Sequence, residues 1–423
     1  MRLELARHVV QSLEFGRRTA FEDGRLVVDR DEIRALVLGD PNVRSVEIEI
    51  VRPGDRVRIV HCMDVVEPRA KASGSGEVFP GFLGPPVTVG SGRTVVLTGV
   101  AIVSTGTWPE LTDPWWSNRE AIIDMGGSAS RYSPYSRTRN LVLSFRTAAG
   151  LTPAQQDHAI RVATLRVARH LALTARDRSP DEVETCELGQ ARGGLPRVAY
   201  ICHLGSLGAL YNTYLYGHSV AGTLPTLIHP NELFDGAVVN GHHRLASERH
   251  PTYDHQNSPV ATELMQRHGR DLNFVGVILM RSLAELPEEK ERLASYTAKL
   301  AKLLGAEAAV ITRQGGGHAI FDLMTTCQRC EQVGIKTALL VNEMAGHAGT
   351  DVSMIDFVPE ADLMVSAGNH EALIDLPALD RAVGGDVLLG MPGRAVDARR
   401  LQLRWVFGAN SQLGVGCLTA RAR

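Results

Sequence analysis

Apolar residues alternate with polar ones, or form short continuous runs, throughout residues 1–150. The clearest runs are SVEIEIV at 45–51, RVRIVHC at 56–62 and RTVVLTGVAIV at 93–103. Runs of this length, bounded by turn residues, are typical of β-strands, so we predict a β-rich N-terminal domain over 1–150. The segment 67–94 is rich in Gly and Pro, and we predict a long loop that either wraps another surface or lies free at the surface.

A helical spacing replaces this pattern after residue 150. Thr152 is a suitable N-cap residue, and Pro153 fits the first position of a helix. Apolar residues then recur on one helical face, at Ile160, Ala163, Val167 and Leu171. We predict a helix that ends near Arg178, followed by a polar linker, over residues 151–195.

Short apolar runs alternate with helical segments from residue 196 to the end of the chain. Continuous apolar strands that alternate with helices indicate a mostly parallel sheet covered on both faces. We therefore predict a doubly wound α/β domain over residues 196–423. The predicted strands are the runs at 198–202, 225–228, 236–240, 273–280, 307–312, 336–341 and 361–366.

Polar residues follow most of these predicted strands. In doubly wound sheets, ligands bind beyond the carboxyl ends of the strands, so these residues form a candidate site. Strands must in any case end in polar loops, which weakens the signal. The set comprises His203, His229, Gly241–His243, Arg281, Arg313–His318, Asn342–Glu343 and Gly368–His370.

Composition and charge exclude several classes of protein. The 45 Lys and Arg residues nearly balance the 47 Asp and Glu residues, which argues against a nucleic-acid-binding protein or attraction to an anionic membrane. No apolar run approaches the roughly 20 residues of a membrane helix, and the first ten residues lack the apolar stretch of a signal peptide. The six cysteines are scattered. We expect a cytoplasmic protein with reduced thiols.

Histidines and one glycine-rich loop are the candidate chemical groups. Eight of the 15 histidines fall between 203 and 268, and His242 and His243 are adjacent. Such a pair could act as a general base or bind a divalent metal such as zinc or iron. The loop 314–318, which contains Gly316, could bind a carboxylate or phosphate at a helix N-terminus. It matches no NAD or ATP motif.

Longer motifs occur in order along the whole chain: MRLEL, VRPGDRVRI, DVVEPR, YSPYSRT, HPTYDHQNSPV, RHGRDLNFVGVI and NEMAGHAG. In these motifs the chain resembles the α-type subunit of component B of the glycine, sarcosine and betaine reductases, which is related to the D-proline reductase proprotein. The resemblance implies a proprotein that cleaves itself before an internal cysteine and converts that cysteine to a pyruvoyl group. It also implies a homologous β-type partner subunit whose selenocysteine or cysteine attacks the substrate.

The sequence departs from this family pattern at the cleavage point. The position that matches the cleaved cysteine is His243, and Ser247 matches a second family cysteine. Pyruvoyl formation requires an acyl shift onto a side-chain sulfur or oxygen, followed by its elimination, and histidine offers neither atom. We therefore predict that the chain remains uncleaved and forms no pyruvoyl group.

The candidate site residues combine the resemblance with the strand-end positions. The predicted catalytic residues are His242, His243 and His255, and the first two are also the candidate metal ligands. The PTYDHQN run carries His255 and places other side chains beside the old cleavage point, while Glu343 could bind a substrate ammonium. The predicted substrate-binding residues are Asn240, Tyr253, Gln256, Asn257, Glu343 and Gly316.

Three functions remain open at this point. The chain is an α-like subunit of a reductase complex that acts on the C–N bond of a small amine or amino-acid-like substrate, without a pyruvoyl group. Alternatively, it is a metal-dependent enzyme in which His242 and His243 hold a Lewis-acidic metal. In the third alternative, it is a catalytically silent structural subunit of a hetero-complex.

Overall fold

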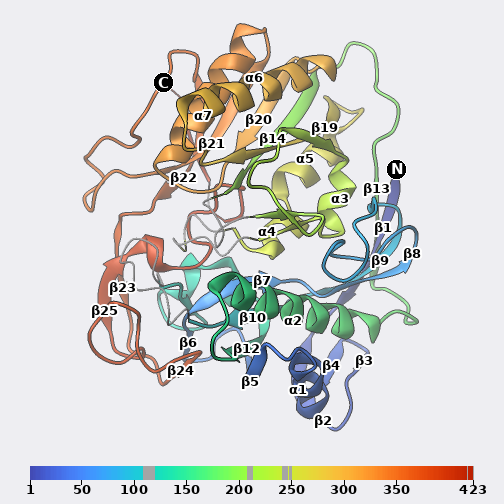
Figure 1. Ribbon diagram of the computed structural model, residues 1–423, viewed down its shortest axis with the longest axis vertical. Helices are drawn as coiled ribbons and strands as arrows, with labels where there is room; N and C mark the ends of the chain where they lie inside the picture. Colours follow the sequence, from blue (N-terminus) through green and yellow to red (C-terminus); the bar gives the residue numbers. More distant parts are fainter. Residues whose placement is uncertain (108–119, 207–212, 241–245, 247–249, 417, 423) are drawn as a thin grey trace.

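The computed structural model of the chain describes residues 1–107, 120–206, 213–240, 246, 250–416 and 418–422. Figure 1 shows two halves, with the helix α4 (Thr252–Gln256) lying between them. Most of the N-terminal half is β-structure, whereas the other half is a sheet with helices on both faces. The α/β class predicted from the sequence is confirmed, including a β-rich N-terminal part.

Two four-stranded sheets form the N-terminal half, in the orders β13-β1-β9-β8 and β5-β12-β10-β7. A smaller sheet, β2-β4-β3, lies beside α1. The bounds are β1 (Arg2–Val9), β2 (Ser12–Gly16), β3 (Ala20–Glu22), β4 (Arg25–Asp29), α1 (Arg30–Leu38), β5 (Val43–Val51), β7 (Cys62–Val66), β8 (Arg69–Ser73), β9 (Gly92–Thr98), β10 (Val100–Thr105), β12 (Arg139–Thr147) and β13 (Glu182–Glu187).

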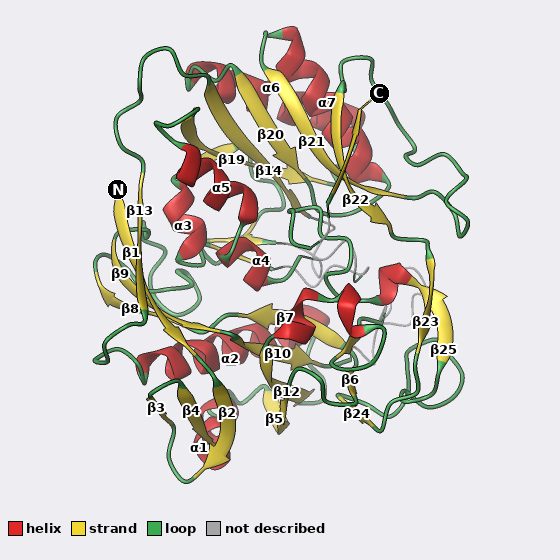
Figure 2. Cartoon of the chain, turned by 180° about the vertical axis from the view of Figure 1, so that it is seen from behind, coloured by secondary structure: helices red, strands yellow, loops and turns green. Residues whose placement is uncertain are grey.

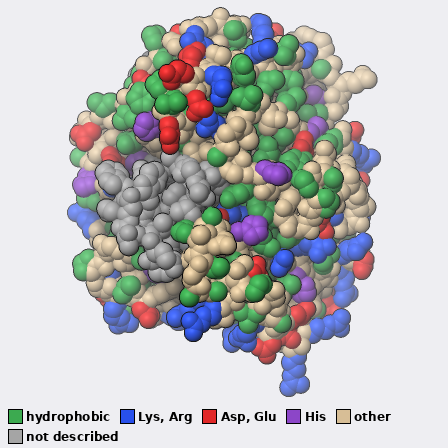
Figure 3. Space-filling view, in the orientation of Figure 1, with side chains coloured by type: hydrophobic (Ala, Val, Ile, Leu, Met, Phe, Trp, Pro, Cys, Tyr) green, Lys and Arg blue, Asp and Glu red, His purple; other side chains and the backbone are tan. Residues whose placement is uncertain are grey.

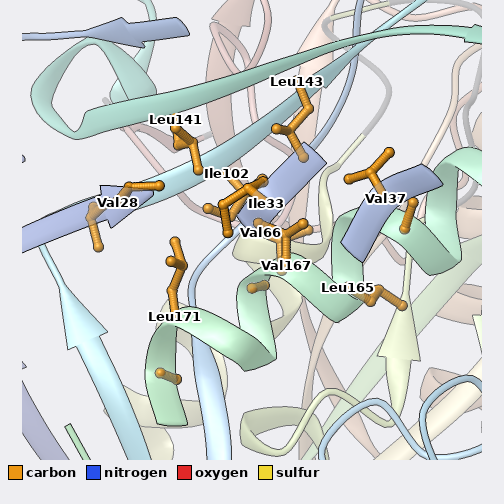
Figure 4. Packing of buried hydrophobic residues seen from close by; sticks show 14 of the residues in the cluster. Val28, Ile33, Val37, Val66, Ile102, Leu141, Leu143, Leu165, Val167 and Leu171 are labelled. Atoms are coloured by element: carbon orange, nitrogen blue, oxygen red, sulfur yellow. The ribbon is translucent and has the colours of Figure 1, made fainter. Parts of the chain in front are cut away.

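The helix α2 (Pro153–Leu173) packs into the core of this half. Its start is fixed by a capping box, in which the Thr152 hydroxyl accepts from the Gln155 amide, and by a proline at the first turn. The helix ends at Leu173 rather than near Arg178, because residues beyond it form turns. Figure 4 shows one face of α2 against α1 and the strands, with Val167 and Leu171 facing residues such as Ile33, Ile102 and Leu141.

The second half contains a seven-stranded sheet in the order β17-β19-β14-β20-β21-β22-β26. The five central strands are parallel, as predicted, and the two edge strands are antiparallel to their neighbours. The strands are β14 (Arg197–Gly205), β17 (Thr226–Ile228), β19 (Asn273–Ser282), β20 (Ala308–Thr312), β21 (Lys336–Glu343), β22 (Leu363–Asn369) and β26 (Thr419–Ala422).

Helices cover both faces of this sheet, which explains why its central strands are continuously apolar. Ala199 and Ile201 of β14 face α6 and α7, whereas Val198 and Tyr200 face α3 and α5. Figures 1 and 2 show these two helix pairs on opposite sides of the sheet. The helices are α3 (Pro230–Phe234), α5 (Pro259–Arg267), α6 (Pro287–Leu303) and α7 (His318–Gln332).

Two predicted strands differ from their predicted placement. The run at 225–228 contains β17, but β17 runs antiparallel to β19, so His229 lies towards the amino end of β19 and caps α3. The run at 236–240 contains β18 (Val238–Val239), which joins a separate small sheet with β15 (Tyr214–Leu215) and β16 (His218–Ser219). Both strands are too short for an apolar run to reveal their direction or partner.

The predicted loop 67–94 is partly strand, because it contains β8 and the start of β9. The rest does cross onto the other half of the molecule. The amide of Phe79 donates to the carbonyl of Asp235 at 3.0 Å, and the amide of Gly90 donates to the Asp235 carboxylate at 2.7 Å. Of the two alternatives, the structure therefore supports a loop that wraps another surface.

The chain returns to the N-terminal half after β22. Strand β24 (Arg381–Val383) pairs in parallel with β6 (Val57–Ile59), beside β11 (Ile123–Asp124). Figure 1 shows β24 and the pair β23 (Leu373–Leu376) and β25 (Arg399–Gln402) below the large sheet. Residues 373–407 therefore pack mainly with the first half, whereas β26 lies in the large sheet. Three 3-10 helices complete the described fold, at Ser130–Tyr132, Pro134–Arg137 and Leu403–Trp405.

Acidic and basic side chains are interspersed on the face shown in Figure 3, in keeping with the near balance of charge in the sequence. Among the described residues, no helix is both long enough and apolar enough to cross a membrane.

Candidate functional site

Buried polar side chains gather where the parallel strands of the large sheet end. His203 is the seventh residue of β14, Gln314 follows β20, Asn342 and Glu343 end β21, and His370 follows β22. All five are buried. The strands that carry them are neighbours in the sheet, so the convergence predicted from the sequence is present in the structure.

Gln314 connects this edge to α4. Its side-chain oxygen accepts from the amide of Gly205 at 2.6 Å and from the Thr213 hydroxyl at 2.7 Å. Its Nε2 lies 2.8 Å from Nε2 of His255. Because the amide nitrogen is a donor, Nε2 of His255 accepts and the ring proton resides on Nδ1. Burial lowers the pKa of His255 to about 3, aided by the nearby His250, so the ring is neutral at pH 7.

His203 lies under the same edge in a more unusual state. Its side chain is fully buried, and neither ring nitrogen has a hydrogen-bond partner among the residues that the structure describes. Burial lowers its pKa to about 3, and the positive charges of Arg313 and Lys290 act in the same direction. A buried polar group without a partner costs stability, so a neutral imidazole with two unused nitrogens indicates a functional constraint.

A polar chain crosses the edge from β20 to β22. The guanidinium of Arg313 donates to Oδ1 of Asn342 at 2.7 Å, and Nδ2 of Asn342 lies 2.8 Å from Nδ1 of His370. Burial lowers the pKa of His370 to about 4, so this ring is also neutral at pH 7. Glu343 accepts from the Ser366 hydroxyl at 2.5 Å, across β21 and β22.

A second feature, which we call the Asp64 clamp, consists of Asp64, Asn240 and Thr252. The Asp64 carboxylate accepts from the amide of Thr252 at 2.8 Å and from its hydroxyl at 2.7 Å. The same hydroxyl accepts from the amide of Asn240 at 3.0 Å, and the Asn240 side chain donates to the carbonyl of Met63 at 3.2 Å. The clamp therefore ties both ends of the segment 241–251 to β7.

Arg161 of α2 reinforces this clamp from the other side. It donates to the carbonyl of Asn240 from Nε at 3.3 Å and from a terminal nitrogen at 3.2 Å. It also pairs with Asp157 and lies 4.3 Å from the ring centre of Tyr214. Arg161 and Asp157 are both buried. The guanidinium therefore makes its ion pair and its hydrogen bonds to Asn240 inside the protein, away from solvent.

The predicted site residues fall into two groups, on opposite sides of α4. His255, Glu343 and Gly316 are at the sheet edge, Gly316 in the loop before α7. Tyr253, Gln256 and Asn257 instead face the N-terminal half. The Gln256 amide bonds to the backbone N–H and carbonyl of Glu67, Asn257 accepts from Arg69 at 2.7 Å, and Tyr253 packs edge-on against Tyr135.

The structure therefore gives Gln256 and Asn257 a docking contact, and a role in substrate binding stays a prediction. Asn240 is buried and belongs to the Asp64 clamp. His242, His243 and Ser247 lie outside the described residues. Within the part of the chain that the structure describes, no three His, Cys, Asp or Glu side chains are grouped closely enough to hold a metal ion.

Sequence reasoning missed Asp64 and Arg161. The sequence did contain a signal for Asp64, which is an acidic residue inside the apolar run CMDVV. Such a residue is expected to be buried with its strand, and a buried carboxylate almost always has a hydrogen-bonding partner. Asp254 was missed as well. It accepts from the Tyr135 hydroxyl at 2.6 Å and from the Ser411 hydroxyl at 3.0 Å, next to His250. Its position inside the HPTYDHQN motif was the available signal.

Comparisons with known proteins agree with the resemblance seen in the motifs. The family model described as glycine/sarcosine/betaine reductase component B subunits matches residues 1–420. The chain is 37% identical to the glycine reductase complex component B subunits alpha and beta of Acetoanaerobium sticklandii, over 100% of both sequences. It is 37% identical to the sarcosine reductase complex component B subunit alpha of Peptoclostridium acidaminophilum, over 91% of this chain and 89% of that protein.

The betaine reductase complex component B subunit alpha of the same organism is 34% identical, over 91% of this chain and 88% of that protein. No solved structure matches the chain.

Proposed function

The chain belongs to the family of glycine/sarcosine/betaine reductase component B subunits, and we propose that it is an α-like subunit that acts on a C–N bond without a pyruvoyl group. The substrate we propose is a small amine or an amino-acid-like molecule, and the enzyme is a hetero-oligomeric reductase complex. The observation that carries the proposal is the family match over residues 1–420, combined with the absence of a thiol or hydroxyl in the stretch NGHHRLA at 240–246.

The residues at the cleavage point do not fit pyruvoyl formation. The group arises from a side chain that carries a sulfur or oxygen on Cβ, because this atom attacks the preceding carbonyl and is later eliminated. Residues 240–246 are Asn, Gly, His, His, Arg, Leu and Ala, and the nearest hydroxyl, that of Ser247, is four residues beyond His243. We therefore assign no step of the reaction to a pyruvoyl carbonyl.

The residues that remain can position a segment and a substrate. The Asp64 clamp holds Asn240 and Thr252, which flank the segment 241–251, and Arg161 also holds Asn240. Gln314 orients the neutral His255, three residues after Thr252. A neutral imidazole can exchange a proton or hold a hydrogen bond to a polar substrate. A carbonyl is not required in every case, because a quaternary amine cannot form an iminium.

The partner supplies the nucleophile in this proposal. A homologous β-type subunit with a reactive cysteine or selenocysteine attacks the α-carbon of the substrate, the C–N bond breaks, and its electron pair leaves with the amine nitrogen. The chain is then expected to release amine only together with this partner. Full turnover by the chain alone would contradict the assignment.

A metal-dependent enzyme is the second candidate, because His242 and His243 are adjacent and histidine is a common ligand of zinc and iron. The metal content of the purified protein separates the two candidates. Near-stoichiometric zinc or iron in the wild type that is lost in His243→Ala would favour the metal-dependent enzyme over the reductase subunit without a pyruvoyl group.

The mass of the purified chain is the first test of the proposal. We expect one uncleaved polypeptide of 45.9 kDa, because no side chain at 240–246 can start the acyl shift. Intact-mass spectrometry of the protein, co-purified with its partner, measures this directly. Two fragments that meet near residue 242 would show that the segment is cleaved despite His243.

The variant His255→Ala tests the sheet edge. We expect about a hundredfold slower amine release by the complex, as is typical when a positioned acid–base group is removed. His218→Ala is the matched control, because His218 is exposed and distant in sequence from the motif. Equal rates for the wild type and His255→Ala would remove His255 from the site.

A further inference from the structure

A polar pocket of about 270 Å³ opens in the N-terminal half, on strands β5, β10 and β12. We call it the His61 pocket. It is separate from the residues at the carboxyl edge of the large sheet, but it adjoins the Asp64 clamp: its Gly106 packs against the side chain of Met63, whose carbonyl holds Asn240. Its lining includes the polar side chains of Glu47, His61, Thr105, Ser144 and Arg146.

His61 is held in the pocket by a buried carboxylate. Glu120 is fully buried, and it accepts from the amides of His61, Ala121 and Leu389 at 2.7, 2.9 and 3.0 Å. Its Oε2 also lies 2.9 Å from Nδ1 of His61. This is a close approach rather than a hydrogen bond, because Nδ1 has no hydrogen-bond partner among the residues that the structure describes. His61 is only 7% exposed and lines the pocket, so its Nε2 is available to a ligand there.

The backbone at His61 is strained in a way that keeps the ring in place. His61 has a φ of 56°, in the left-handed region that residues other than glycine rarely adopt. The carbonyl of His61 accepts from the amide of Gly106 at 3.1 Å, so contacts on both sides enforce this conformation. Strain that the surroundings enforce is found mostly at functional sites. A Cβ on Gly385 would fall 2.4 Å from Nε2, so glycine at this position leaves that nitrogen uncovered.

Two opposite charges stand on the open side of the pocket. Glu47 lies directly across from Ser144, and Arg146 is the next residue along on the same face of β12. Diagonal neighbours of this kind have Cα atoms about 7–8 Å apart. Neither Glu47 nor Arg146 makes an ion pair with any residue that the structure describes. The Thr105 hydroxyl donates to Ser144 at 2.9 Å, which leaves the Ser144 hydroxyl proton for a ligand.

We propose that the His61 pocket binds a small amino acid as a zwitterion, with its carboxylate on Arg146 and Ser144 and its ammonium on Glu47 and Nε2 of His61. The separation of the two charges suits one small molecule, hydrogen-bonded at both ends. The inference rests on the proposed function, since it assigns the recognition of the substrate's charged ends to this pocket. Arg146 and Glu47 are then residues that determine specificity, and His61 is a positioning residue.

Titration calorimetry of the full chain, alone and with its partner, tests this assignment with glycine and betaine as probes. Arg146→Gln and Glu47→Gln are each expected to weaken glycine binding at least about tenfold, because each removes one charge-assisted hydrogen bond. Arg44→Gln is the control, since Arg44 is an exposed arginine of β5 outside the pocket. Glycine should bind more tightly than betaine, which has no N–H to donate to Nε2.

Gly385→Ala gives a second test that leaves both charges in place. The added methyl group displaces the ring of His61, so the Kd, or the KM of the complex, should rise at least about tenfold with an unchanged kcat. Gly189→Ala is the control, because a Cβ there meets open space.

Wild-type affinity and KM in Arg146→Gln, Glu47→Gln and Gly385→Ala would overturn the pocket assignment and leave the proposed function standing. A wild-type complex that neither binds nor cleaves an amine would instead contradict the proposed function itself.

Discussion

Replacing Arg161 by methionine is expected to lower the free energy of unfolding by about 3–5 kcal/mol. Methionine fills a similar volume but removes the ion pair between Arg161 and the buried Asp157 carboxylate, and it also removes both donors to the carbonyl of Asn240. The cation–π contact with Tyr214 is lost as well. Urea denaturation at pH 7 measures the change. Arg166→Met is the matched control, because Arg166 is an exposed arginine of the same helix.

The double variant Asp157→Asn/Arg161→Met separates the buried charge from the other contacts. Removing both charges avoids a buried carboxylate that has lost its ion pair with Arg161, so the double variant should be more stable than Arg161→Met alone. A double variant as unstable as the sum of the two single variants would show that the ion pair is not coupled. The stability that stays lost in the double variant then measures the contacts of Arg161 with the carbonyl of Asn240 and with the ring of Tyr214.

Arg161→Met should also slow amine release by the complex, because Asn240 loses its two hydrogen bonds from the guanidinium. Asn240 would still be held by Thr252 and Met63, and the loss of activity should therefore be partial. Activity that follows only the fraction of folded protein would assign Arg161 to stability alone. Rates measured well below the unfolding transition distinguish the two cases.

The sequence predicted the parallel centre of the large sheet because each of its strands is a continuous apolar run with helices on either side. Run 273–280, for example, corresponds to β19, whose residues face helices on both sides of the sheet. Position at strand ends was then enough to bring Gln314, Asn342 and His370 together. The local pattern was sufficient because neighbouring strands of this sheet run in the same direction, so the residues that follow them lie at the same edge.

The sequence could not show contacts between residues that are distant along the chain and lack a local pattern. Strand β24 pairs with β6 across more than 300 residues, and each strand has only three residues. The Asp64 clamp joins residues almost 190 positions apart through one carboxylate and one hydroxyl. Neither contact leaves a periodic trace, because a single hydrogen-bonded pair imposes no repeat on the sequence.

The split of the PTYDHQN run follows from the short helix that carries it. In α4, consecutive residues point in different directions, so His255 meets Gln314 while Gln256 meets Glu67. A shared motif therefore joins a contact at the sheet edge to a contact with the N-terminal half. The motif therefore identifies α4 as the helix that connects the two halves. Its residues do not all line one site.

Acid is expected to destabilise the protein steeply below about pH 6. Burial lowers the pKa values of His203, His255 and His370 to about 3, 3 and 4 from an ordinary value of 6.5. The unfolded chain then binds more protons than the folded chain, so this stability is present above pH 6.5 and is lost as the pH falls towards the folded pKa. Each histidine should contribute about 1.4 kcal/mol per pH unit within this window.

The variant His203→Leu isolates one of these protons. Urea denaturation at pH 7 and pH 5 should show a smaller acid loss in the variant than in the wild type, by about 1.4 kcal/mol per pH unit. Comparison of the two proteins cancels the titration of every other group. An equal pH dependence would mean that the buried state of His203 is not maintained in solution.

At pH 7, His203→Leu should be as stable as the wild type or more stable, because leucine removes a buried polar ring whose nitrogens have no partner among the described residues. A buried histidine that lowers the stability of the fold is expected to have a functional role. If the stable variant complex releases amine much more slowly, His203 belongs to the reaction site at the sheet edge. A stable and fully active variant would restrict that site to α4, Gln314 and the segment held by the Asp64 clamp.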